Sequence, residues 1–142
     1  MSLAGIRPAL RAYLLADPTI ASAVGGTRVH PVVLPQGVKA TSLVYNVISE
    51  ITDHHTQGPS GLVMVRMQLD AYAQTTDAAD ALARAVKERI DGFAGVWTYG
   101  ASSPSDAVEV QGVFADTARS DYQSDPELFR SSRDYRIFFS ER

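Results

Sequence analysis

Three neighbouring residues, Asp53-His54-His55, are the side chains in this chain best suited to binding a metal ion. Imidazole nitrogens and carboxylate oxygens are ligands that zinc takes in proteins. Adjacent residues of an extended chain point to opposite sides, so His54 and His55 cannot easily hold one ion together. The third histidine, His30, is far away in the sequence, and no HExxH motif is present. We therefore interpret these residues as part of a polar loop and expect no metal and no cofactor.

The chain also lacks nucleophile and phosphate-binding motifs. Ser60 lies in Gly58-Pro59-Ser60-Gly61, which departs from the G-x-S-x-G turn that exposes a catalytic serine. Gly25-Gly26 and Gly92-Phe93-Ala94-Gly95 have neither the glycine spacing nor the Lys-Ser/Thr ending of phosphate loops. Because the chain has no cysteine, thiol nucleophiles, disulfides and zinc–thiolate sites are excluded. We predict that the protein is not an enzyme and has no catalytic residues.

The C-terminal segment interleaves aromatic residues (Phe129, Tyr135, Phe138 and Phe139) with arginines (Arg130, Arg133 and Arg136). Aromatic side chains next to cations can bind single-stranded nucleic acid. The formal net charge of −3 and the scattered lysines and arginines argue against such a groove. We instead interpret one side of this segment as core and the other as an exposed or subunit-facing arginine edge. The residues expected at a subunit interface are Arg66, Arg130 and Arg136.

Length and composition fit one globular domain over residues 1–142. At 142 residues, with 45% hydrophobic and 20% charged residues, the chain is long enough for its own core and has ordinary composition. No apolar run approaches the roughly 18 residues of a membrane span, and the N-terminus does not resemble a secretory signal. We therefore expect no membrane contact.

The elements that position these residues follow from hydrophobic periodicity and capping residues. Helices are predicted over Leu3–Leu14, which contains Pro8, over Pro18–Val24, and from a cap at Thr76 or Asp77 to Ile90. Strands are predicted over Arg28–His30, Leu43–Ile51, Leu62–Tyr72, Val108–Asp116 and Phe129–Ser140. The order α-β-β-β-α-β-β indicates an α+β fold, a mainly antiparallel sheet with helices packed on one face.

Four long loops are predicted between these elements: Val32–Thr41, Thr52–Gly61, Phe93–Ala107 (with a short strand or turn at its start) and Thr117–Leu128. Long loops without catalytic residues favour a protein that contacts other proteins. We expect the Thr52–Gly61 loop to make such a contact, although it could equally serve only to close a hairpin. The proposed contact residues are Asp53, His54, His55, Gln57, Gly58, Pro59 and Ser60.

Several segments, taken in order, resemble the phage tail completion family, the tail-to-head joining or tail terminator proteins. These segments are Leu14–Ile20, Val24–Pro31, Leu34-Pro35-Gln36-Gly37, Val44-Tyr45, Asp53–Leu62, Arg66–Ala73 and the alanine-rich helix Asp77–Ile90. The resemblance covers about Leu3 to Gly95, and the C-terminal third departs more freely. The order and spacing of these segments carry the resemblance.

The resemblance implies a structural virion protein that caps the tail tube at its head-proximal end and joins the tail to the head or neck. It implies a hexameric ring at the head–tail junction, assembled in the host cytoplasm. The implied partners are further copies of the chain, the tail tube protein and a neck or head completion protein. DNA would pass through the ring without sequence-specific binding. Prophages and gene transfer agents carry the same part.

Two other classes of function remain open from the residues alone. One is a small non-catalytic ligand- or protein-binding regulatory domain of bacterial origin, which binding of a metabolite would support. The other is a toxin–antitoxin or effector-binding partner, which co-purification with a single host protein would support.

Overall fold

The computed structural model describes residues 3–35, 37–55, 58–98, 107–123 and 128–140, with the side chains of residues 3–4, 53–61, 107 and 123 left aside. The helices are α1 (Leu3–Leu15), α2 (Pro18–Ala23) and α3 (Thr76–Ile90). The strands are β1 (Val29–Pro31), β2 (Ser42–His55), β3 (Gly58–Ala73), β4 (Gly95–Thr98), β5 (Ala107–Gln123) and β6 (Leu128–Ser140). No helix in the described ranges is long and apolar enough to cross a membrane.

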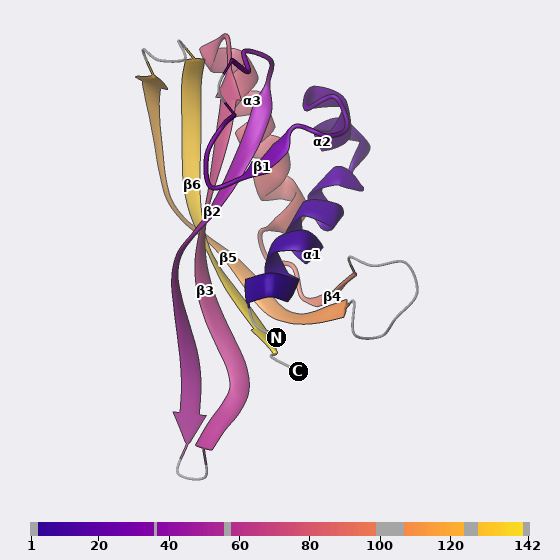
Figure 1. The fold of residues 1–142 in the computed structure, drawn as a ribbon, viewed down its shortest axis with the longest axis vertical. Helices are drawn as coiled ribbons and strands as arrows, with labels where there is room; N and C mark the ends of the chain where they lie inside the picture. Colours follow the sequence, from indigo (N-terminus) through magenta and orange to yellow (C-terminus); the bar gives the residue numbers. More distant parts are fainter. Residues whose placement is uncertain (1–2, 36, 56–57, 99–106, 124–127, 141–142) are drawn as a thin grey trace.

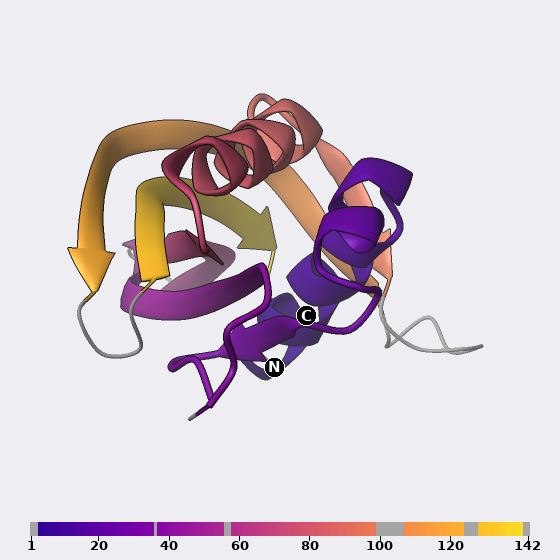
Figure 2. The same cartoon turned by 90° about the horizontal axis from the view of Figure 1, so that it is seen from above.

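The strands form one curled sheet in the order β1-β2-β3-β6-β5-β4 (Figures 1 and 2). Every neighbouring pair is antiparallel except β1 and β2, which are parallel. The helices lie on one side of this sheet, as Figure 2 shows from above. The predicted α+β fold with a mainly antiparallel sheet is therefore confirmed, and the short strand or turn predicted near Phe93 is strand β4.

Alternation along β3 and β6 builds the core between the sheet and the helices. Every second residue of β3 from Val63 to Ala73 is buried, as are Tyr135, Ile137 and Phe139 of β6. These side chains face apolar stripes of α1 and α3, made of Ile6, Leu10, Leu14, Leu82, Val86 and Ile90. Period-two alternation over a helix layer is the pattern of a sheet with one face in the core.

Local capping decides where the helices begin. Asp17 caps α2 by accepting a hydrogen bond from the Thr19 amide at 3.0 Å, with Pro18 at the first helical position. The prediction that Thr76 or Asp77 caps α3 is wrong, because Thr75 Oγ1 accepts from the Ala78 amide at 3.1 Å. Helix α1 begins at Leu3 and contains Pro8 within it.

Two of the four predicted loops are wrong, because both segments continue as strands. Within Thr52–Gly61, β2 runs on to His55 and β3 begins at Gly58. Within Thr117–Leu128, β5 runs on to Gln123. Both segments are polar, and the ladder of backbone hydrogen bonds that builds a strand does not require apolar side chains.

Candidate functional site

The predicted contact loop is the end of a β2–β3 hairpin that projects away from the rest of the sheet (Figure 1). His54 pairs with Pro59 and His55 with Gly58 across the two strands. In the described part of the chain, β6 pairs with β3 from Leu62 to Ala73, so Pro59 lies in a two-stranded part of the hairpin with an open edge, where a strand tolerates proline. Gln57 and the side chains of the other predicted contact residues lie outside the described part.

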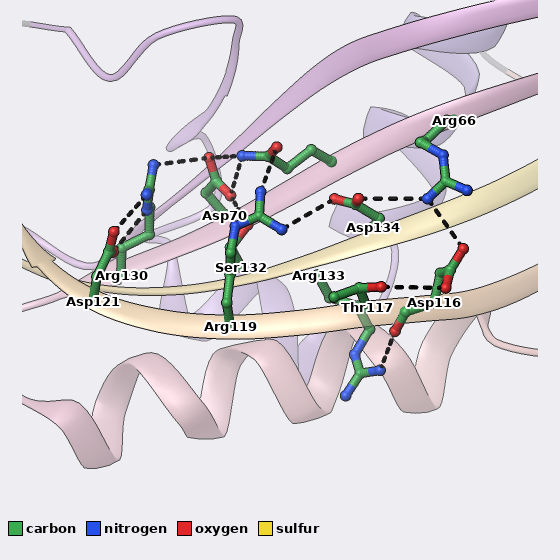
Figure 3. Close-up of polar contacts among 11 residues, drawn as sticks. Arg66, Asp70, Asp116, Thr117, Arg119, Asp121, Arg130, Ser132, Arg133 and Asp134 are labelled. Carbon is green, nitrogen blue, oxygen red and sulfur yellow. Dashed lines mark hydrogen bonds and ion pairs between the residues drawn. The ribbon is translucent and has the colours of Figure 1, made fainter.

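A polar layer covers the sheet face turned away from the helices, which we call the helix-free face. It is formed by alternate residues of β3, β6 and β5 that the strand register brings side by side: Arg66, Gln68, Asp70, Asp116, Arg119, Asp121, Arg130, Ser132, Asp134 and Arg136. Figure 3 shows most of these side chains connected in one network. Four arginines and four aspartates make up its charges, so the network is formally neutral.

Asp70 is the buried anchor at one end of this network. It accepts hydrogen bonds from Ser132 Oγ at 2.5 Å and from Gln68 Nε2 at 2.9 and 3.0 Å. Arg130 donates to both carboxylate oxygens of Asp121, at 2.9 and 2.6 Å, and its Nη1 lies 4.0 Å from Asp70. This end joins three strands around the buried Asp70 carboxylate, with Asp121 on its exposed side.

The Asp121 carboxylate and burial set the protonation behaviour around Arg130. The two hydrogen bonds to Asp121 raise the pKa of Arg130, so its positive charge is fixed. Burial, and then the nearby Asp70 carboxylate, raises the pKa of the Tyr72 hydroxyl, so this group stays neutral.

Asp116 is the partly buried anchor at the other end. Its carboxylate lies 3.0 Å from Arg66 Nη1 and 3.6 Å from Arg136 Nε. The hydrogen bond from Arg66 is the main reason that the pKa of Asp116 falls below its ordinary value. Asp134 connects the two ends, at 3.5 Å from Arg66 and 3.8 Å from Arg119, and Arg119 also donates to Gln68 at 2.9 Å.

The network places the arginines predicted at a subunit interface, Arg66, Arg130 and Arg136, in ion pairs within the chain. The sequence analysis identified these arginines but missed the aspartates that pair with them, because each of those aspartates lies on a different strand from its arginine. Alternation of Arg and Asp on one side of β6 was the available signal, since Arg130, Asp134 and Arg136 share that side. The contacts can stabilise strand register, whereas single exposed pairs of this kind contribute only about 0–1 kcal/mol each.

An apolar strip adjoins the network on the same face. Register places Ile51, Met64, Phe138 and Gly112 in one row across four strands. Phe114 meets Phe138 edge-on at 5.7 Å between ring centroids, and Phe114 and Ile51 are 48% and 58% exposed. The helix-free face therefore has two adjoining areas, the ion network and this apolar strip.

The aromatic residues of β6 divide between the two faces of the sheet. Tyr135 and Phe139 are buried in the core, whereas Phe138 belongs to the helix-free face. The interpretation of one side of β6 as core is confirmed, and Arg130 and Arg136 lie on the other side. That these arginines face another subunit stays a prediction. A single stacking surface built from all four aromatic residues is wrong.

His30 is the one histidine whose side chain the structure describes. Burial, and then the positive charges of Arg11 and Arg28, lowers the pKa of His30, which favours its neutral form. The side chains of His54 and His55 lie outside the described residues. Among the residues that are described, no group of three or more His, Asp or Glu side chains could hold a metal ion.

Comparison with known proteins identifies the family. The model of the family described as "Tail completion protein gp17" matches residues 8–140, and so includes the C-terminal third that the sequence resemblance left uncovered. A chain in the structure described as "Virion of native gene transfer agent (GTA) particle" shares the fold, with a TM-score of 0.70 and 16% identity over 96% of each chain. No curated protein matches this sequence. The chain therefore belongs to the tail completion protein family and is a structural protein of the phage tail, located in the virion.

Proposed function

We propose that this protein caps the tail tube at its head-proximal end and joins the tail to the head, as a hexameric ring without catalytic activity. The observation that carries the proposal is the family match, which spans residues 8–140. A ring of identical subunits needs two different surfaces on each subunit, related by a rotation that closes. The proposed partners are further copies of the chain, the tail tube protein and a neck or head completion protein.

The β2–β3 hairpin is the proposed contact with a neighbouring tail component. Between Leu62 and the turn of the hairpin, no third strand pairs with β2 or β3 in the described part of the chain. A two-stranded ribbon alone is marginally stable in water, so burial against a partner would stabilise it. The proposed contact residues are those at its end: Asp53, His54, His55, Gln57, Gly58, Pro59 and Ser60.

DNA is proposed to pass through the ring without sequence-specific binding. Arg66, Arg119, Arg130 and Arg136 all pair with aspartates on the helix-free face. A channel lined by this face would offer phosphates few free cations, and phosphate contacts supply most of non-specific DNA affinity. Paired charges therefore suit a surface along which DNA must slide.

Electron microscopy of particles from a producing strain that lacks the gene tests the capping and joining role. We expect free heads beside unjoined tails, with tails of irregular length. Normal joined particles would contradict the proposal. Restoring the wild-type gene should restore joined particles and a uniform tail length.

Alanine replacement of His54, His55 and Gln57 tests the hairpin contact. We expect the triple variant to fold, by circular dichroism, and to give fewer joined particles. A matched control is Glu88→Ala on the exposed side of α3, which should leave the yield unchanged. An unchanged yield in the triple variant would remove the hairpin from the contact.

A further inference from the structure

Within the described residues, β2 and β5 each have a long stretch with no neighbouring strand on their outer side. On the outer side of β2, the described contacts from β1 and Val32 reach only as far as Tyr45. On the outer side of β5, β4 pairs up to Val110, and Gly92 and Asp91 bond to Val113 and Ala115. The Asp116 carbonyl accepts a hydrogen bond from Arg133 Nη1 at 2.8 Å. Beyond those points, β2 from Asn46 and β5 from Thr117 present backbone groups that can pair with another chain.

The directions of the two edges suit pairing between copies. Three antiparallel steps lead from β2 through β3 and β6 to β5, so β5 runs opposite to β2. Rotation about an axis roughly along the strands preserves strand direction. Such a rotation would place β2 of the next copy antiparallel to β5 of the first, which extends the sheet from subunit to subunit.

Resting on the ring proposed above, we propose that neighbouring subunits join by pairing these two edges, with Glu50 of one copy opposite Ala118 of the next. The contact is heterologous, since β2 of each copy meets β5 of another. Contacts of this type close into rings, whereas a two-fold contact would stop at a dimer.

The positions of the edges along the strands agree with closure into a ring. Ala118 stands in one row with Arg133, Leu69 and Tyr45, so pairing it with Glu50 shifts the register by the five residues from Tyr45 to Glu50. With one residue taken up by the bulge at Ile48, the shift is about 13–17 Å. The four strands that each subunit adds, β2, β3, β6 and β5, are together about 19 Å wide. A register shift of about 13–17 Å over this width would tilt the strands by about 35–42° from the axis of the ring, as in closed barrels.

Charge complementarity supports the same register. Ala118 lines a hollow of about 350 Å³ between α3 and the sheet, with Arg84, Lys87 and Arg133 among its walls and Asp80 as its acidic residue. Within the described part, no carboxylate forms an ion pair with Arg84 or Lys87. Glu50 is exposed on β2 and faces the helix side, since it pairs with the core residue Val65. Opposite Ala118, its carboxylate would face this basic hollow.

Bulges confine the contact to a short ladder. Register shifts occur between Val47 and Ser49 in β2, and between Ala115 and Ala118 in β5. Bulged edges resist indiscriminate strand pairing. The proposed ladder is therefore limited to about three residues on each side, Ser49–Ile51 against Thr117–Arg119, and ring closure holds it, with the salt bridge as a further contribution.

Disulfide cross-linking tests this register cleanly, because the chain has no native cysteine. Directly opposed residues of an antiparallel pair have Cα atoms about 4.5–5.5 Å apart, within the range of a disulfide. Within one chain, Glu50 and Ala118 are on opposite edges of the sheet, so any bond between them must be intermolecular. Oxidised E50C/A118C, as purified protein and in isolated tails, should give a ladder of covalent oligomers that ends at the closed ring.

The single variants and a matched pair control the experiment. E50C mixed with A118C should give only dimers, and each alone should give none, whereas dimers of E50C alone would indicate a two-fold contact and overturn the proposal. The control pair A81C/E88C, exposed on α3, should give no ladder.

If electron microscopy shows the ring on tails but E50C/A118C does not cross-link, this interface is wrong while the proposed function stands. A second cysteine pair of the same proposed ladder, I51C/T117C, leaves Glu50 in place. Loss of its covalent oligomers on adding Glu50→Lys, and their recovery on adding Arg84→Glu and Lys87→Glu, would confirm the charge pairing, whereas oligomers unchanged by Glu50→Lys would contradict it.

Discussion

Replacement of Asp70 by alanine should be the most damaging change on the helix-free face. Asp70 is 5% exposed and Ser132 is 1% exposed, so the hydroxyl that donates to Asp70 would be left in a site that water hardly reaches. An unpaired buried polar group costs about 1–3 kcal/mol. Asp70 also lies 4.0 Å from Arg130, and loss of one partner from a buried charged pair costs about 3–5 kcal/mol. The cost is smaller here because Arg130 would still form its ion pair with Asp121. We therefore expect Asp70→Ala to lower the free energy of unfolding by about 3 kcal/mol.

Urea unfolding followed by circular dichroism and by fluorescence measures this change. Trp97 is the only tryptophan and is buried, so its emission reports loss of the core. At about 2–4 °C per kcal/mol for a protein near this size, the melting temperature should fall by about 6–12 °C. The matched control is Asp121→Ala, whose side chain is 44% exposed and whose removal should cost no more than about 1 kcal/mol.

A double-mutant cycle with Ser132→Ala tests the stated cause. Removing both partners eliminates the unpaired hydroxyl, so Asp70→Ala should cost about 1–2 kcal/mol less when Ser132 is already alanine. Additive costs would show that the Ser132 hydrogen bond does not contribute. An Asp70→Ala cost equal to that of Asp121→Ala would refute the assignment of Asp70 as the buried anchor.

Three further predictions concern other parts of the molecule. Trp97→Ala should lower the free energy of unfolding by about 3–5 kcal/mol, measured by circular dichroism, because this buried ring stacks on Tyr13 at 5.2 Å between ring centroids; a cost below about 1 kcal/mol would contradict the packing. Thr75→Ala should cost about 1 kcal/mol through loss of the α3 cap, and Thr75→Ser should restore most of it. The hydrogen bond from Arg66 lowers the pKa of Asp116, so this carboxylate stabilises the fold above its ordinary pKa of 3.8 and that contribution is lost as the pH falls further. Asp116→Asn should therefore lose less stability than the wild type between pH 7 and pH 3, and equal losses would exclude this source of acid sensitivity.

Much of the fold could be predicted from the sequence because it depends on local signals. Alternation from Val63 to Ala71 predicted which side of β3 is buried, and the stripe that includes Leu82, Val86 and Ile90 predicted the inner side of α3. The pair Asp17-Pro18 predicted the start of α2. Each signal lies within a few residues of the element that it specifies. The ordered segments that resembled the tail completion family were likewise local, and the family match confirmed them.

Tertiary structure alone decided where the polar segments go and what their charges meet. Residues 52–55 and 117–123 read as loops, yet they are strands, because pairing with a distant partner stabilises them and no local residue pattern records that partner. The same holds for the helix-free face: Arg66 meets Asp134 and Asp116, 68 and 50 residues away in the chain, only through the register of β3, β6 and β5. A one-residue slip would turn these side chains to the other face. The sequence by itself determined the elements and the family, and non-local strand pairing determined the ion network, the projecting hairpin and the two open edges.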